Sequence, residues 1–81
     1  MNKGLQEKNI IGRKVAEGRR LYHPPLTQDA LSGQLARVGT QLDRAAIAKI
    51  EKGYRRVFDY ELKSLAIVLG VKVDWLLDGD A

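Results

Sequence analysis

One short stretch of the chain, residues 44–56, concentrates side chains that recognise a polyanion. Its cationic residues are Arg44, Lys49, Lys52, Arg55 and Arg56. They stand against a single acid, Glu51, and the aromatic residue Tyr54 lies among them. Lysine and arginine neutralise phosphates, and arginine also makes paired hydrogen bonds to the edge of guanine. The stretch therefore indicates nucleic-acid binding, although a solvated helix face followed by a basic loop has the same composition.

The other residue types exclude most catalytic chemistry. The 81 residues contain no cysteine and one histidine, His23, which excludes a thiol nucleophile, a thiolate zinc site and a multi-histidine metal site. The acids Asp74, Asp78 and Asp80 lack the spacing of a metal site, and we expect them to be solvated. No nucleophile–base pair or phosphate-binding loop accompanies them. We therefore expect no enzyme activity, no metal and no cofactor.

Charge is distributed unevenly along the chain. Residues 1–56 carry twelve Lys and Arg against five Asp and Glu, whereas residues 57–81 carry two against five. A net charge of +4 with this asymmetry favours a polyanion partner on one side of the fold. No apolar run approaches the ~18 residues of a membrane span, and no secretory signal opens the sequence. These features predict a cytoplasmic protein without a membrane partner.

The apolar residues of the first half have helical spacing. Ile11 and Val15 begin the apolar stripe of a first helix, which the prolines that follow His23 end. Thr27 is a good N-cap for a second helix. The residues expected on the core side of that helix are Leu31, Leu35 and Val38.

Three further helices are predicted in the second half. Asp43 caps a helix over residues 44–52, and Asp59 caps the next, which ends at Gly70. Residues 71–77 form a short last helix that packs back on the others. The residues expected to seat the third helix on the core are Leu42, Ile47 and Ile50.

The second and third helices together have the pattern of a helix-turn-helix. Small Ser32 beside core Leu31 allows a crossing helix to approach closely, and the third helix is slim and basic on its other side. Such a helix suits the major groove of B-DNA, about 12 Å wide, while its partner crosses the backbone. We predict an all-α fold with one domain over residues 10–78, between a flexible segment (1–9) and a polar tail (79–81).

Three segments resemble the Cro/phage-repressor helix-turn-helix family, also called the xenobiotic-response-element type. They are Leu-Thr-Gln-Asp-Ala-Leu at 26–31, Ala-Ile-Ala-Lys-Ile-Glu-Lys-Gly at 46–53 and Leu-Gly-Val-Lys-Val-Asp-Trp-Leu-Leu at 69–77. The resemblance covers roughly residues 10–78. It implies a compact five-helix, lambda-repressor-like DNA-binding domain that binds palindromic operators as a dimer.

The resemblance implies roles for individual residues. The residues that would face base edges are Arg44, Ala45 and Lys49. The residues that would contact phosphate are Gln28, Tyr54, Arg55, Arg56 and Arg19. Arg19 would also form a partly buried ion pair with Glu51, joining the first and third helices.

The sequence departs from the family between the second and third helices. Ile47 follows Leu35 by twelve positions, and the usual turn of the family is shorter. The extra residues, 36–41, are expected to lengthen the second helix by a turn and to loosen the connection. Thr40 and Gln41 then become candidates for further DNA contacts.

The function predicted from these observations is that of a sequence-specific transcriptional regulator. We expect a repressor that binds double-stranded DNA at an inverted-repeat operator as a homodimer. The dimer contact is expected around Phe58 and the final helix, with Trp75. The alternative is an antitoxin-type interaction module that binds a toxin and also its own promoter.

Overall fold

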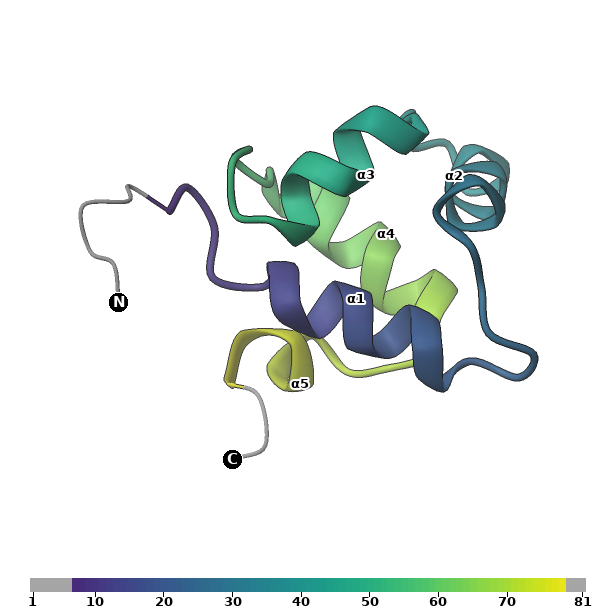
Figure 1. Ribbon diagram of the computed structural model, residues 1–81. Coiled ribbons are helices and arrows are strands. Elements are labelled where there is room, and N and C mark those ends of the chain that lie inside the picture. Colours follow the sequence, from purple (N-terminus) through teal and green to yellow (C-terminus); the bar gives the residue numbers. More distant parts are fainter. Residues whose placement is uncertain (1–6, 79–81) are drawn as a thin grey trace.

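Five α-helices make up the described part of the chain, which contains no strand (Figure 1). The computed structural model describes residues 7–78, so the predicted polar tail, 79–81, lies outside it, as do residues 1–6 of the predicted flexible segment. The helices are α1 (Gly12–Leu21), α2 (Gln28–Arg37), α3 (Arg44–Glu51), α4 (Asp59–Leu69) and α5 (Val73–Asp78). α1 contacts α3, α4 and α5, and α2 packs on α3 and α4. The predicted all-α class with five helices is confirmed over these residues.

One hydrophobic core joins the five helices. Its fully buried side chains are Val15, Leu31, Leu35, Ile47, Ile50, Leu65 and Leu76. Burial of apolar area, at about 25 cal/mol per Å², is the main force that holds such a fold together. Because Ile47 and Ile50 lie on one side of α3, the opposite side of this helix is left to solvent.

Side-chain caps fix where α2 and α3 begin. Thr27 Oγ1 accepts a hydrogen bond from Ala30 N at 3.0 Å, and Asp43 Oδ1 accepts one from Ala46 N at 2.8 Å. Each cap satisfies a backbone donor that has no partner inside the helix. Gly70, with a φ of 70°, ends α4 in the left-handed conformation that glycine adopts readily.

The start of α4 differs from the prediction. Phe58 occupies the cap position and Asp59 is the first helical residue, so the predicted Asp59 cap is wrong. The carboxylate of Glu61 reaches back and accepts from Phe58 N at 3.0 Å. An acid at this third helical position satisfies the cap residue's own amide, whereas the phenyl ring of Phe58 offers no acceptor.

The predicted extension of α2 is also wrong. The helix ends at Arg37, and the chain reverses through Gly39, whose φ is 87°. Val38, predicted in the core, is 46% exposed because it follows the end of the helix. Most of the extra residues therefore belong to the connection between α2 and α3.

This connection is anchored to α4. Thr40 and Leu42 are both buried, and the hydroxyl of Thr40 hydrogen-bonds with that of Ser64 in α4. The expected loosening is therefore absent, and Thr40 is not accessible to DNA. Gln41 remains exposed.

Residues 7–9 are packed on the domain. Lys8 N donates to Gly53 O at 2.8 Å, and Asn9 Oδ1 accepts from the amides of Ile11, the cap residue of α1, and Gly12, its first residue. These contacts involve the described part of the segment predicted to be flexible, and its flexibility stays a prediction.

Gly12 lies where α1 approaches α3 closely, and Gly33 in α2 provides a comparison. A Cβ on Gly12 would collide with the backbone carbonyls of Ile50 and Glu51, whereas a Cβ on Gly33, in α2, meets open space. We expect Gly12→Ala to lower the free energy of unfolding by about 1–3 kcal/mol. Gly33→Ala should raise it by about 0.5–1 kcal/mol, because alanine is the better helix former. Urea unfolding measures both, and an undiminished stability of Gly12→Ala would contradict the close approach.

Candidate nucleic-acid interface

α3 exposes the three residues predicted to face base edges. Arg44, Ala45 and Lys49 are all exposed, whereas Ile47 and Ile50 are buried, and we call these three exposed residues the outward face of α3. The side chain of Arg44 is 68% exposed. A helix with its side chains is about 10–12 Å across, which matches the major groove of B-DNA. The fold therefore brings these residues together on one accessible surface.

A partly buried ion pair holds the last residue of α3. Arg19 Nε donates to Glu51 Oε2 at 2.7 Å and Arg19 Nη2 donates to Glu51 Oε1 at 2.9 Å; the two side chains are 16% and 9% exposed. Arg19 Nη1 donates to Leu26 O at 2.9 Å, and Gln28 Nε2 donates to Glu51 Oε1 at 3.0 Å. The hydrogen bond to Glu51 raises the pKa of Arg19, despite burial, so the guanidinium stays charged. The ion pair that the resemblance implied is present, and it ties α1 and the start of α2 to α3.

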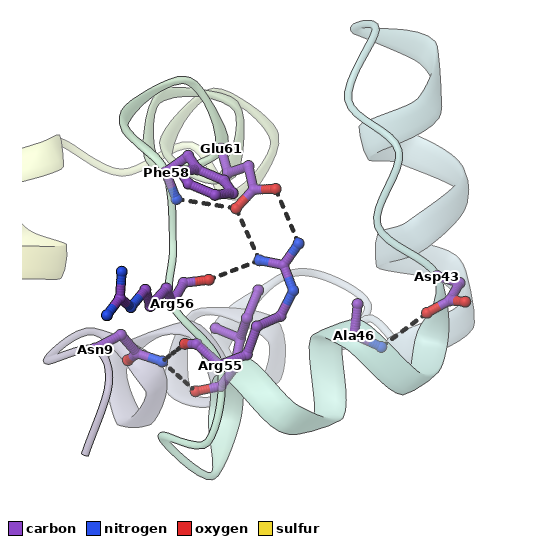
Figure 2. Close-up of polar contacts among 8 residues, drawn as sticks. Asn9, Asp43, Ala46, Arg55, Arg56, Phe58 and Glu61 are labelled. Atoms are coloured by element: carbon purple, nitrogen blue, oxygen red, sulfur yellow. Dashed lines mark hydrogen bonds and ion pairs between the residues drawn. The ribbon is translucent and has the colours of Figure 1, made fainter. Parts of the chain in front are cut away.

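A second ion pair holds the loop that follows α3 (Figure 2). Arg55 Nη1 and Nη2 donate to the two carboxylate oxygens of Glu61 at 2.9 and 3.1 Å, and Nη1 also donates to Arg56 O at 2.7 Å. The Glu61 side chain is 4% exposed. The hydrogen bond to Glu61 raises the pKa of Arg55, so this guanidinium is charged as well. The loop is therefore fixed to the first turn of α4.

The Glu61 carboxyl is charged in the folded protein. Burial raises its pKa, but hydrogen bonds from the Arg55 guanidinium and from Phe58 N lower it by more, so the net pKa lies below the ordinary value. The ionised form is the one that both donors need.

Asn9 joins the N-terminal residues to the end of α3 and to the loop that follows it. Its amide nitrogen donates to Ile50 O at 3.0 Å and to Arg55 O at 2.8 Å (Figure 2). The last carbonyl groups of a helix have no intrahelical partners. Asn9 donates a hydrogen bond to one of them, Ile50 O. α3 is therefore held at its start by Asp43 and at its end by Asn9.

The residues predicted to contact phosphate fall into two groups. The polar groups of Arg19, Gln28 and Arg55 are engaged within the chain, as described above, and their contact with phosphate stays a prediction. Tyr54 is 62% exposed and Arg56 is also exposed, directly after α3 and its Gly53 turn. Tyr54 and Arg56 are therefore the predicted phosphate contacts with accessible side chains.

Glu61 and Asn9 were missed by the sequence reasoning. Glu61 precedes Leu65 by four residues, so helical periodicity places it on the core side of α4, and an acid at such a position calls for a partner. No local pattern reveals Asn9, because its partner Arg55 lies 46 residues away.

Residues 7–78 show neither a metal site nor a membrane-spanning helix. No group of three or more His, Asp or Glu side chains in this part of the chain could hold a metal ion. No helix among these residues is long and apolar enough to cross a bilayer.

No model of a protein family matches the chain. Comparison with curated proteins and with solved structures also found no match. The resemblance to the helix-turn-helix family remains a prediction from the quoted segments. Any functional conclusion therefore rests on the geometry and charge of the described residues.

The Arg55–Glu61 pair makes stability depend on pH. A carboxyl with a lowered folded-state pKa stabilises the protein above the unfolded value of about 4.3, and that contribution is lost as the pH falls through the folded value. We expect Glu61→Gln to cost about 1–3 kcal/mol at pH 7 and to flatten the fall in unfolding free energy between about pH 5 and pH 3. Urea unfolding at several pH values measures both effects.

Glu17→Gln is the matched control, because the Glu17 side chain is 46% exposed and pairs only at the surface. It should leave both the stability and its pH dependence nearly unchanged. Equal pH profiles for wild type and Glu61→Gln would contradict the role given to Glu61.

Proposed function

We propose that this protein is a sequence-specific DNA-binding transcriptional regulator of the Cro/phage-repressor type, acting as a homodimeric repressor. The observation that carries the proposal is the outward face of α3: an accessible, slim and cationic surface on a helix held by the Arg19–Glu51 ion pair, by the Asp43 cap at its start and by Asn9 at its end. Such a helix enters the major groove while its N-terminal residues contact base edges. Occupation of an operator would then block access of RNA polymerase.

Base contacts and phosphate contacts are assigned to different residues. Arg44, the first residue of α3, donates two hydrogen bonds to guanine, and Lys49 reads a neighbouring base edge. Arg56, Tyr54 and Lys52, all exposed beyond the outward face, contact phosphates and supply affinity without sequence information. Affinity should therefore fall steeply with salt concentration.

Selection of bound sites from random DNA, followed by affinity titrations, tests the proposal. Arg44→Ala should lose about 1–3 kcal/mol of discrimination at one base pair of the selected site. Arg56→Ala should weaken binding to all sequences alike and lower the salt slope by about one.

Lys72→Ala is the matched control for lost charge. Lys72 is an exposed cation directly before α5, and α5 lies on the other side of α1 from α3 (Figure 1). It should bind like the wild type. The proposal would be overturned if the selection enriched no sequence. It would also be overturned if the Arg44 and Arg56 variants behaved identically.

The homodimer is proposed to form through an exposed aromatic pair. The rings of Phe58 and Tyr60 stack with centroids 6.1 Å apart, and the residues are 55% and 58% exposed. They follow the loop after α3, so a second copy docked there would hold two recognition helices in a fixed relation. On B-DNA such helices are spaced about 34 Å apart.

Phe58→Ala should weaken dimerisation at least about fivefold, because it removes a large apolar contact, while binding to an isolated half-site is retained. Sedimentation equilibrium measures the dimer, and Leu21→Ala, at another exposed apolar residue, is the control. A wild-type protein that is monomeric both free and on an inverted repeat would exclude the dimer. Copurification of such a monomer with a stoichiometric protein partner would favour the antitoxin-type alternative.

A further inference from the structure

The first turn of α2 reaches α3 at both of its ends. Gln28 hydrogen-bonds with Glu51, the last residue of α3, and Asp29 Oδ2 lies 4.0 Å from Nη1 of Arg44, the first residue. Positions 44 and 51 are about two turns apart and therefore lie on one side of the helix. The start of α2 thus borders the outward face, and Asp29 is the acid placed beside Arg44.

The pair of Asp29 and Arg44 contributes little to the stability of the free protein. Both side chains are largely exposed, 74% and 68%, and such surface pairs are weak in water. The geometry has a different consequence when DNA covers the two side chains and removes water. A guanidinium has five donors, of which a guanine contact uses two, so a carboxylate can accept from another and limit the orientations of the group.

Asp29 also places a negative charge next to the outward face of α3, which is proposed to bind DNA. This charge repels phosphates and so lowers affinity for DNA of any sequence. A purely structural account would assign Asp29 to the favourable interaction of an acid with the N-terminus of α2. That account predicts no effect of Asp29 that depends on Arg44.

We propose that Asp29 is a positioning residue for Arg44, which increases discrimination at the base pair that Arg44 reads and decreases general affinity. The proposal rests on the proposed function and adds a residue that sets selectivity. Discrimination comes from the restricted guanidinium, which makes its full contact with guanine alone, whereas the repulsion of phosphates lowers affinity for all sequences alike.

A double-mutant cycle tests the proposal on the full chain. Wild type, Asp29→Ala, Arg44→Ala and the double variant are titrated at one salt concentration with three DNAs: the selected site, the site with the Arg44 base pair replaced, and an unrelated sequence. We expect Asp29→Ala to reduce the affinity ratio between the first two DNAs by about three- to tenfold and to raise affinity for the unrelated DNA. In the Arg44→Ala background, the same change should leave the ratio unaltered.

Asp59→Ala is the matched control, since Asp59 is an exposed acid in the first turn of α4. It should not change the ratio, and urea unfolding of each variant shows whether the fold is retained. An unchanged ratio in Asp29→Ala, or the same loss in both backgrounds, would overturn the positioning role while leaving the proposed function intact. Failure of random DNA to yield a preferred site would overturn both.

Discussion

The ion pair between Arg19 and Glu51 is the interaction on which the placement of α3 depends. Two charges that are largely withdrawn from water are tolerated only where hydrogen bonds replace their hydration. Both carboxylate oxygens of Glu51 and three nitrogens of Arg19 are engaged in this way. Apolar packing of Ile47 and Ile50 would hold the helix against the core, but the directional bonds also fix its rotation about its own axis. That rotation decides which side chains face outward.

The arginines of this fold have two different roles. Arg19 and Arg55 each lie against a shielded carboxylate and act as internal braces, whereas Arg44 and Arg56 extend into solvent. The braces keep the exposed cations in place, so affinity for a polyanion and rigidity of the surface come from separate residues. A count of basic residues along the chain overstates the charge that a ligand would meet, because part of it is neutralised inside the protein.

The helices and most of the core could be predicted from the sequence because they follow from local patterns. Apolar periodicity, the caps Thr27 and Asp43 and the turn glycines fix where the helices lie. Val38 continued that periodicity and was misplaced, because its spacing does not reveal that the helix ends one residue before it. The contacts of Thr40 with Ser64 and of Asn9 with Arg55 join residues far apart in the sequence, and the partner of a polar side chain is set by the tertiary structure. The outward face of α3 could be predicted for the same reason as the helices, whereas the partners of Arg55 could not.

Asn9 holds the C-terminal end of α3 and the loop after it by donating to two main-chain oxygens, those of Ile50 and Arg55. Peptide carbonyls are the same whatever side chains the residues carry, so this attachment does not depend on the identities of the solvent-facing amino acids. Exchange of the exposed residues Arg44, Ala45 and Lys49 for others therefore leaves these two hydrogen bonds in place.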